Sequence, residues 1–258
     1  MTLSQPKEYK EVKIHNLRLT LGSYSEIVHR IYNESQLFNN RLIITPNIGH
    51  LHSLRTKDRY RSALNQAFLS LPDGWPIAML ASLTTRTWQS RITGSDLILK
   101  LLFMDKETCW KVAVLGLPTS YHEKLKAVLK ESARNVELVY LNDMNPSVFL
   151  SGDALTKIAQ EINILKPNLI ISSFGSPKQE LFNHEILVKG SFGIAIGGGA
   201  SIDFLVGKQK RSPRFFRIIG LEWLYRIVRE PRRLIFRYIV GLCELNILIA
   251  RHLFSKLG

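Results

Sequence analysis

A single carboxylate, Asp73, lies in an otherwise apolar stretch of the chain. Residues 67–80 read AFLSLPDGWPIAML, and most neighbours of the carboxylate are residue types that folded proteins bury. Burial disfavours the charged form of a carboxyl group, so its pKa rises above the ordinary value of ~3.9. A carboxylate with a raised pKa is a candidate general base. A helix cap after Pro72 is the alternative.

Two glycine-rich segments are candidates for binding an anion. The sequence GSPKQE at 175–180 joins a predicted strand to a predicted helix, where free N–H groups bind anions and where Lys178 and Gln179 could contact a phosphate or a sugar hydroxyl. The second segment is IGGGASIDF at 196–204. Neither matches the dinucleotide-binding fingerprint or the P-loop, which disfavours a cofactor-dependent oxidoreductase and a P-loop NTPase. Ordinary turns and tight packing remain the alternatives.

No metal site is expected from the sequence. His50 and His52 are two residues apart, which suits neither one face of a helix nor a zinc motif, and no D-x-D occurs. Arginines must therefore supply the positive charge if the chain handles a diphosphate. Cys109 and Cys243 are far apart and no secretory leader is recognisable, so we expect a reducing, cytoplasmic setting.

Apolar strands alternate with amphipathic helices along most of the chain, and these elements must position the candidate residues. Residues 1–40 are weakly patterned apart from an amphipathic stretch at 24–31. A helix at 94–103 has Ser95 or Asp96 as its candidate N-cap. The alternation predicts an α/β fold with a parallel sheet covered by helices on both faces. Strands are predicted at 41–47, 68–71, 110–117, 136–141, 167–175 and 191–199, and helices at 48–67, after 74, and at 94–103, 120–133, 153–166 and 177–187.

Polar and glycine-rich turns follow five of the predicted strands. Open parallel sheets bind ligands outside the carboxyl ends of their strands. One such turn would mean little, because loops favour these residues, but five in register predict a crevice. The turns are at 45–47, 72–74, 116–118, 175–179 and 197–199.

Positive charge gathers near the end of the chain. The 258 residues carry a formal net charge of +14, and residues 207–258 hold twelve Lys or Arg against three Glu. Such a segment favours an anionic partner. Its arginines alternate with aliphatic side chains and no nucleic-acid-binding motif occurs, so nucleic acid is not expected. We predict an α/β core at 1–206 and a basic amphipathic, membrane-associating appendage at 207–258.

A long helix is predicted to begin near Pro231, a favoured first helical position. Charged residues interrupt its apolar run, so it lacks the ~18 uncharged residues that spanning a membrane requires. A helix with a wide apolar arc and a narrow charged stripe can lie in a bilayer interface, pack into a protein groove or form a contact between subunits. All three remain open. The stripe consists of Arg233, Arg237, Glu244 and Arg251.

Together these segments resemble the WecG/TagA/CpsF family of bacterial glycosyltransferases (glycosyltransferase family 26) over about residues 12–240. The most specific signal is GLEWLYRIVREPRRL at 220–234. Departures are small, because Ala200 replaces an expected glycine and Ser212 a common alanine. The other shared motifs are T-x-N at 45–47, P-D-G at 72–74, R-x-x-G-x-D at 91–96, G-x-P-K-Q-E at 175–180, the glycine-rich motif at 197–207 and KRSP at 210–213.

The resemblance implies a Rossmann-like α/β fold with a basic helical C-terminal appendage that docks on the membrane and completes the active site. It implies inverting, metal-independent and cofactor-independent transfer of a sugar from a UDP-sugar to a polyprenyl-diphosphate-linked sugar in cell-surface polysaccharide biosynthesis. The transferred sugar would be N-acetylmannosamine or a related hexose or uronic acid. The expected location is the inner face of the bacterial cell membrane, bound peripherally. A homo-oligomer remains open.

The resemblance also assigns roles to single residues. Asp73 matches the catalytic base, which takes the proton from the acceptor hydroxyl. Thr45, Asn47 and Gln179 match polar positions that hold the donor or the acceptor. The predicted substrate site also includes residues of the glycine-rich turns, namely Gly116, Pro118, Gly175, Pro177, Lys178, Gly197 and Gly199.

Four charged residues complete the predicted site. Arg226 and Arg233 match appendage arginines that neutralise diphosphate, a role that guanidinium geometry suits. Arg91 and Asp203 match motif residues of less defined function, for which an Arg91–Asp96 ion pair and a structural cap at Asp203 are alternatives. The main alternative for the whole chain is a non-catalytic nucleotide-binding or scaffold protein at the membrane surface.

Overall fold

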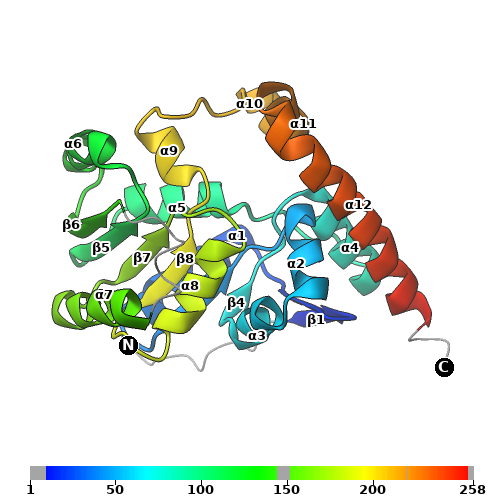
Figure 1. The fold of residues 1–258 in the computed structure, drawn as a ribbon, viewed down its shortest axis with the longest axis horizontal. Helices are drawn as coiled ribbons and strands as arrows, with labels where there is room; N and C mark the ends of the chain where they lie inside the picture. The colour runs from blue at the N-terminus through cyan, green and yellow to red at the C-terminus, as the bar shows by residue number, and fades with distance from the viewer. Residues whose placement is uncertain (1–9, 144–151, 219, 255–258) are drawn as a thin grey trace.

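A parallel β-sheet forms the centre of the protein (Figure 1). The computed structural model describes residues 10–143, 152–218 and 220–254, without the side chains of residues 152, 218 and 233. Within these residues, six parallel strands are arranged in the order β4-β3-β8-β7-β5-β6. The α/β fold and the parallel sheet are therefore confirmed. The strands are β3 (Arg41–Ile44), β4 (Leu69–Ser70), β5 (Trp110–Leu115), β6 (Val136–Asn142), β7 (Leu169–Ser172) and β8 (Ile194–Gly197).

Helices cover both faces of this sheet, as the apolar strands require. Side chains alternate across a strand, so Ile43 packs with the helices of one face while Leu42 and Ile44 pack with those of the other. The first face is covered by α1 (Tyr24–Ser35), α5 (Gly94–Phe103) and α6 (His122–Ser132). The second is covered by α2 (Leu51–Thr56), α3 (Asp58–Gln66), α7 (Gly152–Leu165) and α8 (Lys178–Ile186). Short 3-10 turns lie at η1 (Ile48–His50) and η2 (Thr119–Tyr121).

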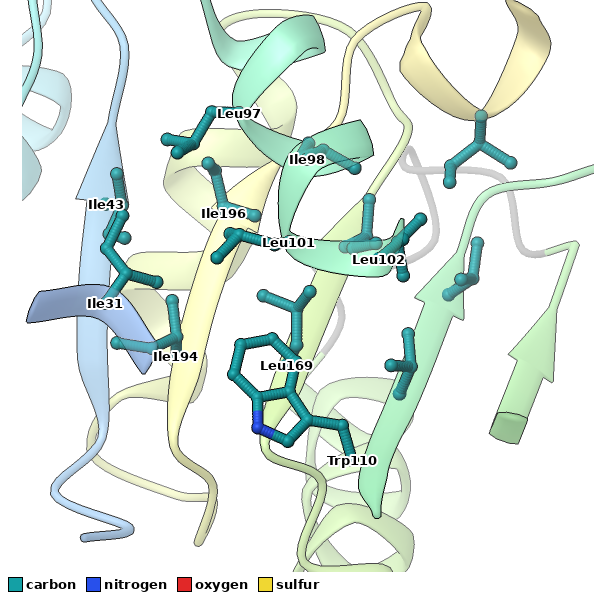
Figure 2. Packing of buried hydrophobic residues seen from close by; sticks show 14 of the residues in the cluster. Ile31, Ile43, Leu97, Ile98, Leu101, Leu102, Trp110, Leu169, Ile194 and Ile196 are labelled. Carbon is teal, nitrogen blue, oxygen red and sulfur yellow. The ribbon is translucent and has the colours of Figure 1, made fainter. Parts of the chain in front are cut away.

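Helix α5 is held against the sheet by a fully buried apolar cluster. In Figure 2, Leu97, Ile98, Leu101 and Leu102 of α5 lie over the strands, close to Ile196 of β8. Full burial of each such side chain contributes about 1.5–3 kcal/mol. This packing fixes the first turn of α5 at the carboxyl edge of the sheet, where the predicted crevice lies.

The N-cap prediction for α5 is wrong. The cap is Thr93, whose Oγ1 accepts a hydrogen bond from the backbone N–H of Asp96 at 3.1 Å. The Asp96 side chain instead accepts hydrogen bonds from Thr93 Oγ1 at 2.7 Å and from Arg211. The carboxylate that resembled a cap therefore ties α5 to the segment that precedes the C-terminal helices.

An antiparallel hairpin, β1 (Glu11–Ile14) and β2 (Leu17–Thr20), was not predicted within the weakly patterned N-terminal segment. The Ser70 hydroxyl donates a hydrogen bond to the Arg18 carbonyl at 2.6 Å, and Thr20 Oγ1 accepts one from the Ser70 N–H at 3.2 Å. These bonds place the hairpin beside β4, at the edge of the sheet.

The C-terminal part of the chain is helical, and the helix predicted from Pro231 is confirmed. This part of the chain contains α10 (Arg214–Ile218), α11 (Glu222–Arg229) and α12 (Pro231–Phe254), after the short α9 (Ser201–Leu205). The helix predicted from Pro231 is α12. Figure 1 shows α12 running along one side of the molecule, near α2 and α4 (Trp75–Thr85). Among the described residues, none of the helices has the length and apolar character needed to cross a bilayer.

The charged stripe of α12 includes a partly buried ion pair with the core. Glu244 is only 5% exposed, and it accepts a hydrogen bond from Arg55 Nε of α2 at 2.7 Å and contacts His52 Nδ1 at 2.9 Å. The apolar arc of the same helix is exposed at Phe236 and Ile239. Helix α12 therefore exposes part of its apolar arc, while Leu245 and Leu248 pack against the core.

Candidate active site

Two cavities meet at the carboxyl edge of the sheet, and Asp73 lies where they join. One cavity has a volume of about 540 Å³ and is lined mainly by polar atoms. The other has a volume of about 400 Å³ and is lined mainly by apolar atoms. Residues from the core and from the C-terminal helices line both cavities; they are Asn47, Asp73, Ser95, Arg226 and Tyr238.

The turn that carries Asp73 is fixed by its backbone. The Asp73 N–H donates a hydrogen bond to the Pro46 carbonyl at 3.0 Å, which ties the turn after β4 to the loop after β3. Gly74 has a φ of 83°, a left-handed conformation that glycine adopts without strain. Gly74 is also the N-cap residue of α4, so Asp73 does not cap this helix and its carboxylate is left for another role.

The surroundings of Asp73 raise its pKa to about 6. The half-buried carboxyl group is largely surrounded by protein atoms, and this desolvation is the main cause. The neighbouring Glu222 carboxylate raises the pKa further. A hydrogen bond from Asn47 Nδ2 at 3.3 Å and the charges of Arg91 and Arg226 act in the opposite direction. Asp73 is therefore a stronger base than an ordinary aspartate, and it is still mostly ionised at neutral pH.

The polar cavity is formed by loops from three neighbouring strands and by side chains of α11 and α12. Thr45 and Asn47 follow β3, Gly175 and Gln179 follow β7, and the glycine-rich turn 197–199 follows β8. These segments are far apart in the sequence and converge because parallel strands end at one edge. Arg226 and Arg237 reach the same cavity from α11 and α12.

Gln179 is held by hydrogen bonds to both ends of its side-chain amide. Its Oε1 accepts a hydrogen bond from the Gly199 N–H at 3.1 Å, and its Nε2 donates one to Glu180 Oε1 at 2.8 Å. A Cβ at Gly197 would overlap the Gln179 amide, so glycine is required there to make room for it. The second glycine-rich segment therefore positions a polar side chain at the cavity wall.

His50 and Glu180 are buried near this cavity. Burial raises the pKa of Glu180, and burial together with the charge of Arg237 lowers the pKa of His50 to about 3. His50 is therefore neutral at physiological pH. Among the described residues, no group of three or more His, Cys, Asp or Glu is arranged to hold a metal ion. The cationic side chains that line the polar cavity are Lys208, Arg226 and Arg237.

Arg91 and Asp203 both line a cavity, and both make structural contacts. Arg91 lines the apolar cavity, and its Nη2 donates a hydrogen bond to the Arg217 carbonyl at 3.0 Å. The alternative Arg91–Asp96 pair is wrong, because Asp96 pairs with Arg211. Asp203 lines the polar cavity and binds Lys208 Nζ at 3.0 Å.

Other predicted site residues lie away from the cavities or outside the description. In the described part of the chain, neither cavity is lined by Gly116, Pro118, Pro177 or Lys178. Gly116 has a φ of 84° and packs so closely on the Phe174 ring that a Cβ would overlap it, so its role is packing. Lys178 is exposed. Arg233 belongs to α12, but its side chain lies outside the described residues.

Three residues that line one or both cavities were not predicted as site residues. They are Glu222, Tyr238 and Arg237, from the C-terminal helices. Glu222 belongs to the GLEWLYR segment, so that motif could have pointed to it. Tyr238 lines both cavities, and burial raises its pKa. Nothing in the local spacing of Arg237 or Tyr238 identifies them, because the packing of α12 brings them to the site.

Comparison with known proteins gives three relatives named N-acetylglucosaminyldiphosphoundecaprenol N-acetyl-beta-D-mannosaminyltransferase. The relative from Bacillus spizizenii is 32% identical over 181 residues, which cover 68% of this chain and 66% of the relative, just under two thirds of its length. The relative from Bacillus subtilis is 26% identical over 229 residues, covering 85% of this chain and 84% of the relative. The relative from Staphylococcus aureus is 24% identical over 238 residues, covering 91% of each.

The model of the glycosyl transferase WecG/TagA/CpsF family matches residues 12–257. This match includes both the α/β core and the C-terminal helices that close the site. The motifs that the sequence shares with the family lie largely around the two cavities. The chain therefore belongs to the glycosyl transferase WecG/TagA/CpsF family.

Proposed function

We propose that the protein is an inverting glycosyltransferase that moves a sugar from a UDP-sugar to a polyprenyl-diphosphate-linked sugar. The observation that carries this proposal is the position of Asp73, a carboxylate with a raised pKa, between a polar cavity and an apolar one. The names of the relatives support a lipid-linked acceptor and N-acetylmannosamine as the transferred sugar.

In the proposed reaction, a hydroxyl oxygen of the acceptor sugar attacks the anomeric carbon of the donor. Asp73 takes the hydroxyl proton, the bond from the anomeric carbon to the diphosphate oxygen breaks, and UDP leaves with the bonding electrons. A single displacement of this kind inverts the configuration at the anomeric carbon. Base catalysis typically contributes 10²- to 10⁴-fold in rate.

The polar cavity is the proposed donor site. Thr45 and Gln179 offer hydrogen-bonding groups for the nucleotide or the sugar, while Arg226 and Arg237 supply positive charge. Arginine side chains stabilise diphosphate oxygens by charge-assisted hydrogen bonds. We propose that these arginines, with Arg233, compensate the negative charge that develops on the leaving UDP, so that neither a metal ion nor a cofactor is required.

We further propose that the C-terminal helices hold the protein on an anionic membrane surface, at the inner face of the cell membrane. Exposed apolar side chains on α11 and α12, including Val228, Phe236 and Ile239, lie among basic residues. A helical surface of this kind binds an interface through apolar insertion and attraction to anionic lipid. An oligomer that buries the same surface remains open.

A non-catalytic scaffold or nucleotide-binding protein is not favoured. Such a protein has no need for a carboxylate whose burial raises its pKa, with a second carboxylate, Glu222, beside it. The like charges oppose folding at neutral pH and are useful for proton transfer.

To test the proposal, the protein is incubated with each of a panel of UDP-sugars and a short-chain polyprenyl-diphosphate GlcNAc analogue, and the products are detected by mass spectrometry. We expect transfer from UDP-N-acetylmannosamine or a related UDP-sugar, with the acceptor extended by one sugar. Failure of every UDP-sugar to give a product, under conditions in which the protein is folded, would overturn the proposal.

A further inference from the structure

The apolar cavity is larger and more apolar than the binding of two sugars beside Asp73 requires. The cavity has a volume of about 400 Å³ and lies between α4, α11 and α12. Met79 and Leu83 of α4 and Leu242 of α12 line it. Pockets of this size typically enclose most of a small ligand. Sugars and nucleotides are rich in hydroxyl groups and charges, so this lining suits neither.

The charged side chains of the cavity gather around Asp73. Arg91, Glu222 and Arg226 all line the cavity and act on the pKa of Asp73. Much of the remaining wall consists of aliphatic and aromatic side chains. The cavity is thus charged at the end beside Asp73 and apolar along the rest of its length. A ligand that matches this polarity gradient has an anionic group near the two arginines and a hydrocarbon chain along α4 and α12.

The outer rim of the cavity opens to exposed apolar side chains. Met79 is 57% exposed, Leu83 is 71% exposed and Leu242 is 50% exposed. Single exposed apolar residues are ordinary, but a group of them along a groove marks a site for a ligand or a membrane. The rim belongs partly to α12, whose apolar arc is partly exposed, at Phe236 and Ile239 for example. A chain that leaves the cavity here would therefore continue into lipid.

We infer that the apolar cavity binds the first isoprene units of the acceptor's polyprenyl chain, with the diphosphate beside Arg91 and the rest of the chain in the bilayer. This inference rests on the proposed function. The UDP-sugar has no hydrocarbon tail, so the lipid-linked acceptor is the substrate that matches the gradient. The seated chain directs the acceptor sugar to the junction of the cavities, where Asp73 meets its hydroxyl. Binding of the lipid therefore also positions the nucleophile.

The test measures transfer in solution, without membranes, to GlcNAc-diphosphate esters that differ only in the length of the prenyl chain. The series runs from a methyl ester through roughly one to four isoprene units, a range suited to a cavity of this size. Each enclosed unit removes several carbon atoms from water, so we expect the KM for the acceptor to fall about tenfold or more per enclosed unit. The KM should then level off once the cavity is full, while the KM for the UDP-sugar stays constant.

Substitutions on two different helices localise the effect. Leu242→Glu on α12 and Met79→Glu on α4 each place a charge on the cavity wall at a position already half exposed. We expect each to raise the KM of the prenyl acceptors by about tenfold or more, toward that of the methyl ester. The matched control is Ile164→Glu, at an apolar residue of α7 that is 81% exposed and does not line the cavity. It should keep the dependence on chain length, and thermal unfolding checks that all three variants are folded.

The outcomes separate the two levels of the proposal. Absence of transfer from every donor to every acceptor would overturn the proposed function, and the inference would fall with it. Transfer with one KM for all chain lengths, or wild-type dependence on chain length in both Leu242→Glu and Met79→Glu, would show that the cavity is not a prenyl site while the proposed function stands. Loss of the dependence in Ile164→Glu would also contradict the assignment.

Discussion

Replacement of Asp73 by asparagine should remove activity and at the same time make the protein more stable. The folded structure raises the pKa of Asp73 from 3.8 to about 6. A difference of this size corresponds to about 3 kcal/mol at neutral pH, and an allowance for the residual solvent exposure of the carboxylate reduces it to about 2 kcal/mol. The amide oxygen of the variant can still accept the hydrogen bond from Asn47.

The size of the stabilisation depends on pH. Because the pKa of Asp73 is raised in the folded state, its stabilising contribution is fully present below pH 3.8 and is lost as the pH rises through about 6. The advantage of Asp73→Asn over the wild type should therefore grow across this window. At neutral pH we expect a melting temperature higher by about 4–8 °C, and kcat lower by about 100- to 10,000-fold.

Differential scanning calorimetry and a radiolabel transfer assay on the same preparations measure both quantities. Asp58→Asn serves as the matched control, since the side chain of Asp58 is 95% exposed and its pair with Arg61 lies on the surface. That change should leave stability within about 0.5 kcal/mol and activity unaltered. Full activity in Asp73→Asn would refute the role as base. Loss of both stability and activity would instead indicate a structural role.

Two further predictions concern residues of the C-terminal helices. Glu222→Gln removes a charge that raises the pKa of Asp73, so the acidic limb of the pH–rate profile should move to lower pH; an unchanged profile would contradict the coupling. Glu244→Gln keeps an acceptor oxygen but removes the negative charge that pairs with Arg55, whose side chain is 42% exposed, so α12 should dock less firmly, with a loss of up to about 1 kcal/mol in the free energy of unfolding. The hydrogen bond from Arg55 lowers the pKa of Glu244, so this contribution is present above pH 4.5 and is lost as the pH falls. Thermal unfolding as a function of pH measures it, and equal stability of variant and wild type at pH 7 would contradict it.

The periodicity of the sequence was sufficient to predict the central sheet and its helices. Buried strands and amphipathic helices have distinct patterns, and both recur from β3 to β8. The hairpin β1–β2 was missed because its strands, EVKI and LRLT, mix apolar with charged residues and lack the continuous apolar run of the buried parallel strands. The N-cap of α5 was assigned to Ser95 or Asp96 instead of Thr93 because all three residues are good caps, and only the backbone geometry decides between them.

In the candidate site, too, the residues next to predicted strands could be placed from the sequence, whereas those brought in by long-range packing could not. The rule that ligands bind at the carboxyl ends of strands brought Thr45, Asp73 and Gln179 together correctly at one edge. Arg237 and Tyr238 could not be placed, because they reach the site through the docking of a helix that is distant in the sequence. The charged stripe of α12 was visible in the sequence, but its inward direction depends on partners in α2.

The pH dependence of kcat/KM tests the central claim, that Asp73 is the base of the transfer. With a pKa of about 6 for this group, kcat/KM should rise about tenfold per pH unit in the acidic range, reach half of its maximum near pH 6 and level off above it. Calorimetry at each pH confirms that the protein stays folded throughout. A profile that is flat between about pH 5 and 7 would contradict the claim, since no group with the pKa of Asp73 would then control the reaction.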